Sequence, residues 1–258
     1  MTLALATAWH PRGELTRFQR LLPELGQVYA ELVISLPPQP DPVLVEALRA
    51  SNPRLALVIT HDWSWGRYAA LQMALETQCN HIHYADFDRL LRWVETRPEE
   101  WLSTVSAIQE SECLLVGRTP AAYATHPRAL VQTEAISNQV ISHLLGRPVD
   151  VSAGSKGFSR TAAAYLIANT IPGHALGTDG EWPVLLQRAG FRVDYISVDG
   201  LDWESADRFQ EQAANLHNQR QAAEVYDADP QNWQHRVAVA TEIIHYGLAA
   251  SERDLFGH

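Results

Sequence analysis

Two aspartates one residue apart, Asp86 and Asp88, directly follow a short apolar segment at 80–84. Carboxylates at the carboxyl end of a strand can hold Mg²⁺ or Mn²⁺, because these hard cations prefer oxygen ligands and often bridge a protein carboxylate to a substrate phosphate. A metal ion in that place would neutralise a diphosphate leaving group. The alternative is structural, with Asp88 capping the next helix and Asp86 in a solvated turn. The pair alone leaves both interpretations open.

A second acidic pair, Asp179 and Glu181, precedes an apolar segment in the later part of the chain. Together with Thr178, Glu181 fits the Thr-x-x-Glu capping box, which stabilises the start of a helix without any chemistry. The functional alternative is that Asp179 or Glu181 orients an acceptor hydroxyl and removes its proton as a new bond forms.

Two further places offer polar groups suited to a sugar or a phosphate. Segment 152–160 contains two glycines, three serines, Lys156 and Arg160, so its backbone amides can approach a ligand closely. A plain loop before a helix explains this composition equally well. Arg67 stands at the start of the helix that precedes the strand before Asp86. Its guanidinium is a candidate to contact a diphosphate or a nucleotide base, and the alternative is an arginine that faces only solvent.

The elements that position these residues alternate between strand and helix. Apolar runs predict strands at 3–8, 28–36, 55–60, 80–84, 113–117 and 191–198. Helical spacing predicts helices at 15–25, 42–51, 68–75, from 90, from 99, at 136–144, 161–169 and 181–189, and from 230 onward. The polar segment 205–223 is a candidate lid. Such alternation predicts an α/β protein with a mostly parallel central sheet flanked by helices, and ligands at the carboxyl ends of the strands.

Composition narrows the functional classes. The chain has 258 residues, 46% of them hydrophobic and 19% charged, which favours a packed globular body over disorder. The net charge of −10 opposes non-specific binding to nucleic acid. No apolar run is long enough to span a membrane, and the two cysteines suggest no disulfide framework, so we expect a soluble cytoplasmic protein. We expect one domain, with a nucleotide half at 1–118, an acceptor half at 119–228 and a C-terminal helix at 229–258.

The order of these features resembles the GT-A glycosyltransferases, especially those of the family 2 type. The resemblance spans most of the chain and rests on short segments at 7–10, 66–71, 86–88, 152–160, 178–183 and 189–191. It implies a GT-A-type nucleotide-diphospho-sugar transferase fold, with Mg²⁺ or Mn²⁺ held by Asp86 and Asp88. Retaining enzymes such as mannosylglycerate synthase and glucosyl-3-phosphoglycerate synthase share the broad layout, so the stereochemistry stays open.

The resemblance also implies roles for individual side chains. It assigns a catalytic role to Asp179 or Glu181. It makes His217, in the polar segment after the last predicted strand, the candidate for a third metal ligand, with a surface histidine as the alternative. It assigns donor contacts to Thr7, Arg67, Gly154, Ser155 and Lys156.

The chain departs from the family where the nucleotide base binds. Many family 2 members place an aspartate just after the second strand, whereas this chain has Ser35, Leu36, Pro37 and Pro38 there. Asp62, after the third predicted strand, is the candidate substitute. UDP and GDP donors both stay open.

The sequence therefore predicts a metal-dependent glycosyltransferase that moves a sugar from a nucleotide-diphosphate donor to a small hydroxylated acceptor. The alternatives are a metal-dependent nucleotidyltransferase and a catalytically degenerate protein that binds a nucleotide-sugar. The sequence predicts neither a nucleic-acid partner nor a membrane span, and it leaves the oligomeric state open, a homodimer included.

Overall fold

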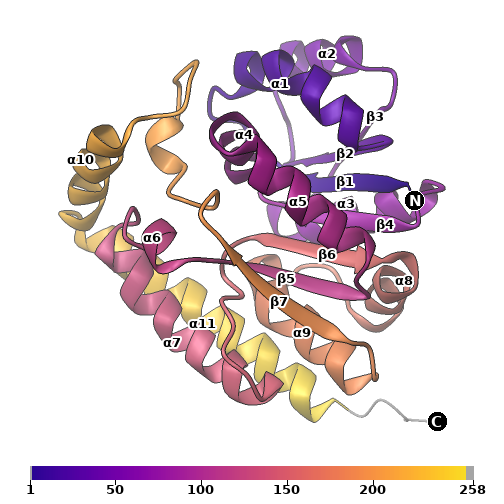
Figure 1. Ribbon diagram of the computed structural model, residues 1–258, viewed down its shortest axis with the longest axis vertical. Coiled ribbons are helices and arrows are strands. Elements are labelled where there is room, and N and C mark those ends of the chain that lie inside the picture. The colour runs from indigo at the N-terminus through magenta and orange to yellow at the C-terminus, as the bar shows by residue number, and fades with distance from the viewer. Residues whose placement is uncertain (1, 254–258) are drawn as a thin grey trace.

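Seven strands form a single sheet at the centre of the computed structural model, which describes residues 2–253 (Figure 1). The strands are β1 (Leu3–Ala8), β2 (Glu31–Leu36), β3 (Leu55–Ile59), β4 (His81–Ala85), β5 (Cys113–Arg118), β6 (Ser155–Ser159) and β7 (Val193–Val198). Their order is β3-β2-β1-β4-β6-β5-β7, and every neighbouring pair is parallel except those that involve β6. The predicted α/β class and mostly parallel sheet are confirmed.

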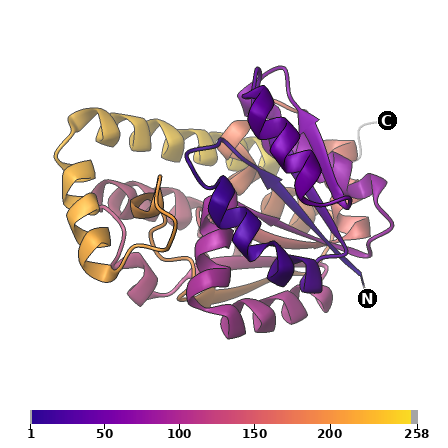
Figure 2. The same ribbon diagram turned by 90° about the horizontal axis from the view of Figure 1, so that it is seen from above.

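Helices cover both faces of this sheet. They are α1 (Leu15–Val28), α2 (Pro42–Ser51), α3 (Gly66–Glu76), α4 (Phe87–Thr96), α5 (Pro98–Gln109), α6 (Pro120–Tyr123), α7 (Arg128–Leu145), α8 (Arg160–Asn169), α9 (Thr178–Arg188), α10 (Leu216–Asp227) and α11 (Pro230–Glu252). The long α11 runs beside α7 and α9, with α10 leading into it at one end (Figure 2). Asp229 begins α11 as predicted, since its carboxylate accepts the Gln231 N–H.

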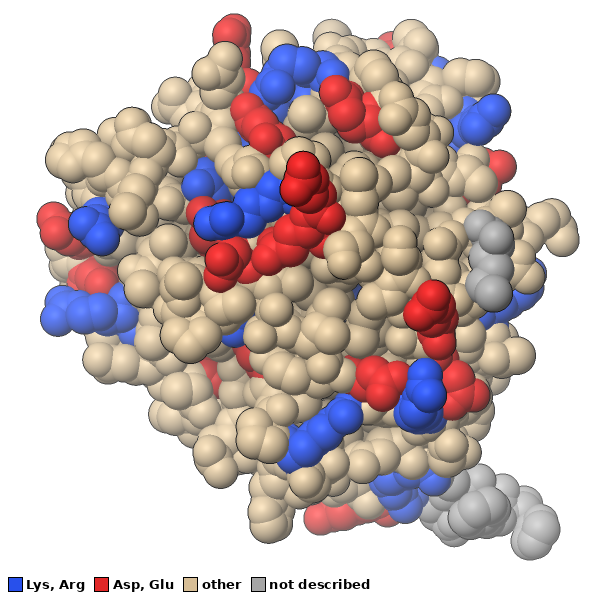
Figure 3. Space-filling model, viewed as in Figure 1, with Lys and Arg blue, Asp and Glu red and all other residues tan. Residues whose placement is uncertain are grey.

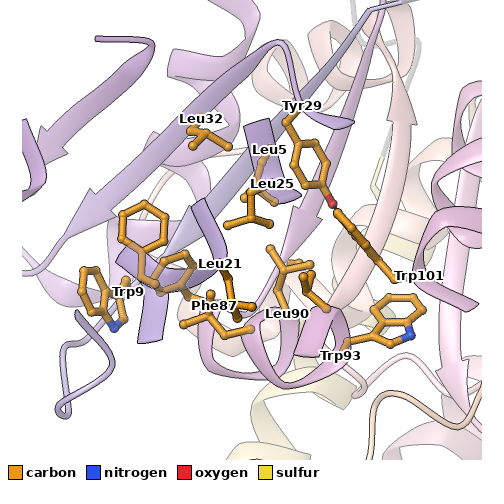
Figure 4. Packing of buried hydrophobic residues seen from close by; sticks show 14 of the residues in the cluster. Leu5, Trp9, Leu21, Leu25, Tyr29, Leu32, Phe87, Leu90, Trp93 and Trp101 are labelled. Atoms are coloured by element: carbon orange, nitrogen blue, oxygen red, sulfur yellow. Dashed lines mark hydrogen bonds between the residues drawn. The ribbon is translucent and has the colours of Figure 1, made fainter. Parts of the chain in front are cut away.

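The alternation of side chains along β1 divides the core into two clusters. Leu3 and Leu5 pack on one face with side chains of α1, α2, α4 and α5. Figure 4 shows part of this cluster, with Leu25 of α1, Leu90 of α4 and Trp101 of α5 on the same side of the sheet as Leu5. Ala4 and Ala6 pack on the other face with α3, α8, α9 and α11. Because strand side chains alternate between faces, the small alanines let helices approach one face closely while the leucines fill the other.

The sheet differs from the interpretations of the sequence in two places. Segment 152–160 is not a plain loop, because Ser155–Ser159 forms β6 between β4 and β5, the one antiparallel strand in the described structure. The 55–60 run is not a doubly buried strand either. It forms β3 at an edge of the sheet, and Ile59 is exposed.

The predicted apolar faces of two helices were also wrong. Ile136 of α7 and Val237 of α11 are exposed, at 59% and 54%, although both belong to the apolar positions at helical spacing on which these two helices were predicted. The buried face of α7 carries Glu134 and Asn138 instead, because these side chains bind Arg118 and Asp150 in a buried charged network. In α11, Ala240 is buried as predicted.

Candidate functional site

The Asp-Phe-Asp segment follows β4 directly, and its middle residue anchors it. Phe87 is buried with its ring centroid 4.7 Å from that of Trp9 and 5.2 Å from that of Phe18 (Figure 4). The Asp86 N–H donates to the Gly154 carbonyl at 2.8 Å, which ties the segment to the residue before β6. The backbone that carries both aspartates is therefore fixed from two sides.

Asp86 occupies the N-cap position of α4, yet its side chain does not cap the helix. Its carboxylate instead accepts hydrogen bonds from Arg67 Nη2, at 3.0 and 3.3 Å, and from the Tyr84 hydroxyl at 3.3 Å. Gly154, with φ +72°, lies against this carboxylate, since a Cβ on it would come within 2.6 Å of Asp86 Cγ. The position of Asp86 favours the functional interpretation over the solvated turn.

Asp88 lies in the first turn of α4 among other acids. Burial raises its pKa to about 7, and the negative charges of Glu204 and Asp86 add to that shift. Glu204, from the segment after β7, is itself paired with Arg89 at 3.2 Å. A carboxylate that burial and like charges hold in its neutral form gains free energy from a nearby cation. The donor set at Asp88 thus fits a divalent ion.

A buried row of alternating charges leads from Asp86 into the protein. Arg67 Nη1 donates to Asp179 Oδ1 at 2.6 Å, and Lys156 Nζ donates to the same oxygen at 2.5 Å. Burial alone would raise the pKa of Asp179, but the charges of Arg67 and Lys156 outweigh it and hold that pKa below its ordinary value. Arg67 is 7% exposed, so it is not the solvent-facing helix arginine of the alternative interpretation.

A cavity of about 710 Å³ opens in front of the aspartates at the carboxyl ends of the first strands, and both line it with Arg67. Other walls come from the ends of β2 and β3 and the loop after β1; they include Trp9, Arg12, Ser35, Thr60 and Trp63. Glu14 orders that loop by accepting from Trp9 Nε1 at 3.1 Å and from the Arg12 N–H at 2.6 Å.

Two buried hydroxyls at strand ends have no hydrogen-bond partner among residues 2–253, and one of the two lines this cavity. They are Thr7 Oγ1, near the end of β1, and Ser35 Oγ, near the end of β2. Ser35 lines the cavity. Buried polar groups are normally hydrogen-bonded, so unpaired hydroxyls at strand ends indicate a place where a ligand completes the bonding.

The structure brings some of the predicted residues together and leaves others apart. Arg67 and Gly154 contact Asp86, and Asp179 and Lys156 are linked to it through Arg67, whereas Ser155 Oγ lies 2.9 Å from His83 Nε2 within the sheet. Asp62 is exposed at the start of a short 3₁₀ helix at 63–65, where it accepts the Ser64 N–H, and it does not line the cavity. His217 lies exposed on α10, away from the cavity lining.

The capping box predicted for the start of α9 does not form. The N-cap residue is Gly177, and the Thr178 hydroxyl donates to the Ala175 carbonyl at 3.0 Å. Glu181 is fully buried and bound to His174 Nδ1 and to Arg253 Nη2, both at 2.8 Å. Because residues two apart on a helix point in different directions, Glu181 faces α11 while Asp179 faces Arg67.

Sequence reasoning missed two residues near the aspartates. His235, in the first turns of α11, lines the cavity, although it is almost 150 residues away from Asp88 in sequence. Glu204 raises the pKa of Asp88 from the segment after β7. No local motif marks either residue, and only the fold places them there.

Within residues 2–253, no group of three or more His, Cys, Asp or Glu side chains is arranged to enclose a metal ion. Mg²⁺ and Mn²⁺ are commonly held by one or two carboxylates together with substrate phosphates, so Asp86 and Asp88 match that mode better than a closed protein cage. No helix in this part of the chain is long and apolar enough to cross a membrane. On the face in Figure 3, acidic and basic side chains are intermixed.

No family model matches the chain, and no curated protein matches it in sequence. Solved structures do match. Glucosyl-3-phosphoglycerate synthase of M. tuberculosis aligns with a TM-score of 0.58 and 15% identity, over 99% of this chain and 82% of that one. Its complex with Mn²⁺, UDP and phosphoglyceric acid aligns with a TM-score of 0.56 and 14% identity, over 99% and 80%. The chain has the GT-A fold.

Within this GT-A fold, the place of the aspartates follows from topology. Asp86 and Asp88 follow β4, which pairs with β1 on one side and with the antiparallel β6 on the other. The chain places β2 and β3 on one side of β1 and then β4 on the other side, and ligands of α/β proteins bind at such reversals of strand order, outside the carboxyl ends of the strands. The fold predicted from the order of short motifs is confirmed at the level of architecture.

Proposed function

We propose that this protein transfers a sugar from a nucleotide-diphosphate donor to a small hydroxylated acceptor. The observation that carries the proposal is the position of Asp86, Asp88 and Arg67 at one end of the 710 Å³ cavity. Two carboxylates and a guanidinium there can share the charge of a diphosphate and a divalent ion. The opposite walls, with Trp63 and the strand-end hydroxyls, suit a nucleoside.

We propose UDP rather than GDP as the nucleotide carrier. Guanine presents an amino group and a ring N–H, and a carboxylate is the side chain that accepts from both. Ser35, Pro37 and Thr60 form the wall near the ends of β2 and β3, and the only carboxylates among the described lining residues are Asp86 and Asp88. Hydroxyls suit the single N–H and the carbonyls of uracil. The neighbouring synthase in complex with UDP supports the same choice.

Asp86 and Asp88 would hold the Mg²⁺ or Mn²⁺, and His10 and His235, which both line the cavity, are the candidates to add a nitrogen ligand. When bound, the ion supplies positive charge that stabilises the departing diphosphate. Arg67 supports that role from the protein side, because its Nη2 already reaches the Asp86 carboxylate at 3.0 Å. The aspartates thus need no large rearrangement to meet a diphosphate.

We assign Asp179 a positioning role instead of the role of a general base. Its Oδ1 accepts from both Arg67 and Lys156, its low pKa makes it a weak proton acceptor, and it is not among the residues that line the cavity. Glu181 is bound to His174 and Arg253 and lines no part of the cavity in the described chain. Asp179 therefore acts by holding Arg67 toward Asp86.

A nucleotide-sugar panel tests the proposal. The protein is incubated with UDP- and GDP-sugars, with and without Mn²⁺, while nucleoside diphosphate and pyrophosphate are both measured in the presence of small hydroxylated acceptors. We expect UDP release that requires the metal. Pyrophosphate release would show nucleotidyl transfer instead, and donor binding without any turnover would show a degenerate binding protein.

The variant Asp88→Asn isolates the metal site, and Asp62→Asn is its matched control, because Asp62 is an exposed aspartate outside the cavity. We expect Asp88→Asn to remove the Mn²⁺-dependent part of UDP affinity, measured by calorimetry, while Asp62→Asn leaves it unchanged. Equal UDP affinity in both variants and in the wild type would reject Asp88 as a metal ligand.

A further inference from the structure

A second cavity, of about 530 Å³, lies between the end of α6, the start of α7 and the length of α10. Figure 1 shows α6 and α10 at the same side of the molecule. Of the described residues, none lines both this cavity and the one at Asp86. Its volume lies within the range of about 300–1,000 Å³ that small-molecule sites occupy. We call it the α10 cavity.

The walls of the α10 cavity are fixed by hydrogen bonds between distant segments. The Asp227 carboxylate, at the end of α10, accepts the N–H groups of Arg128 and Ala129, both at 2.9 Å, and so caps α7 from outside. Thr125 Oγ1, on the opposite wall, accepts the Trp203 N–H at 2.8 Å. The backbone of these walls is therefore held in place, while Arg220 and Glu224, which are exposed on α10, are ordered only when a ligand binds.

The charges that line this cavity balance. Arg128 and Arg220 contribute two positive charges, and Glu224 and Asp227 contribute two negative ones. Arg128 and Asp227 are already paired at 3.3 Å. Arg220 and Glu224 have no side-chain hydrogen bond or ion pair within residues 2–253, so one donor group and one acceptor group stay available. Because the positive and negative charges of the lining cancel, the cavity does not attract an ion of either sign. A neutral ligand that both donates and accepts hydrogen bonds fits this lining better.

His126 adds an unpaired acceptor in the same wall. Its Nδ1 lies 3.0 Å from the Ala122 carbonyl oxygen, which can only accept, so Nδ1 carries the proton and Nε2 keeps its lone pair. Nε2 is buried and has no partner, although the residue is 6% exposed and lines the cavity. Burial, with the charges of Arg118 and Arg89, holds the pKa of His126 well below its usual value, so the ring is neutral. A hydroxyl is the kind of donor that Nε2 lacks.

We propose that the α10 cavity binds a neutral polyhydroxylated molecule of the size of a mono- or disaccharide. Hydroxyl groups donate to Glu224 and accept from Arg220, so one ligand class satisfies both unpaired side chains. The methyl groups of Ala124, Ala223 and Ala228 offer apolar contacts to the C–H surface of a sugar ring. This proposal does not depend on the transferase activity at Asp86.

Saturation-transfer NMR and calorimetry with glucose, mannose, maltose and trehalose test the proposal, with inorganic phosphate as the ionic probe. Ala124→Trp fills the cavity from an exposed lining position, and Ala121→Trp is its matched control, because Ala121 is exposed on the same short helix but does not line the cavity. Arg220→Ala removes the free donor. Circular dichroism confirms that each variant folds.

We expect at least one sugar to bind saturably in the millimolar range, with affinity at least tenfold weaker in Ala124→Trp, about fivefold weaker in Arg220→Ala and unchanged in Ala121→Trp. Sugar binding that survives in Ala124→Trp would place it elsewhere and overturn the proposal. Binding of phosphate without any sugar would also overturn it, and so would the absence of binding by every probe.

Discussion

The buried pairing of Asp179 with Arg67 and Lys156 makes Asp179→Asn the most informative substitution in the chain. The replacement keeps the size of the side chain but removes its charge. Arg67 retains the Asp86 carboxylate as a partner, whereas Lys156, which is 1% exposed, has no second carboxylate within residues 2–253 and keeps only neutral acceptors, the Val151 carbonyl at 3.4 Å and the new amide oxygen. The substitution therefore leaves one ammonium group buried without a carboxylate partner.

The size of the effect follows from these contacts. Each pair of unit charges about 4 Å apart gains roughly 4 kcal/mol at an effective dielectric constant near 20, and the desolvation of the charges offsets much of that gain. Removing one partner of a buried pair costs about 3–5 kcal/mol, because the other charge stays buried. We expect Asp179→Asn to lose that much free energy of unfolding, measured by urea denaturation and tryptophan fluorescence.

Two further variants test whether the lost buried charge pair is the cause of the destabilisation expected in Asp179→Asn. Asp194→Asn makes the same chemical change in the surface pair with Arg192, which is 65% exposed, and we expect it to cost less than about 1 kcal/mol. Lys156→Met should cost less in the Asp179→Asn background than in the wild type, because the ammonium group that it removes has then lost its partner. A stable Asp179→Asn variant that binds UDP normally but loses turnover more than 100-fold would refute the positioning role and make Asp179 the base.

Three further predictions concern the cavity and the sheet. Gly154→Ala should weaken Mn²⁺-dependent UDP binding at least tenfold in calorimetry, because φ is +72° there and a Cβ would displace the Asp86 carboxylate; unchanged binding would contradict the assigned metal site. Trp63→Ala should weaken UDP binding by about 1–3 kcal/mol without lowering stability, since Trp63 lines the cavity at 64% exposure and can stack on a base; equal affinity would remove it from the donor site. Burial lowers the pKa of His83 to about 3, so the unfolded chain takes up a proton there near pH 6.5 while the folded protein does not, and His83 should contribute a loss of stability of about 1.4 kcal/mol per pH unit between pH 6 and 4; removing it in His83→Gln should lower the measured slope by that amount, and an unchanged slope would exclude the contribution.

The first four strands were predictable because their sequences carry the signal of the sheet. The predicted apolar runs end within one residue of the ends of β1, β2 and β4, and the Asp-Phe-Asp segment follows β4 directly. β6 gave no such signal. Its sequence lacks β-branched residues and contains Lys156, whose charge is tolerated in the middle of the sheet only because Asp179, on α9, neutralises it. A partner that distant cannot be inferred from a local pattern.

Distant partners also limited what the sequence could predict about the candidate site. Asp86 and Asp88 could be proposed from the sequence because two carboxylates at a strand end form a pattern within one short segment. Glu204 and His235 reach the same region from later segments that the fold brings back to β4, and no spacing in the sequence links them to the motif. The wrong buried face of α7 has a related cause, because its buried Glu134 is compensated by Arg118 from β5.

The four residues 86–89 explain why the site can be rigid without a closed cage around a metal ion. Asp86 and Asp88 line the cavity, whereas Phe87 packs against Trp9 and Arg89 binds Glu204 and, through Nη1, the Ser152 carbonyl at 3.1 Å. Phe87 and Arg89, which are bound inside the protein, therefore hold in place the backbone of Asp86 and Asp88, which line the cavity. Side chains held in this way stabilise developing charge at little cost of reorganisation. The identity of the residue between the aspartates is therefore part of the site: replacing Phe87 with a small side chain would release both carboxylates together.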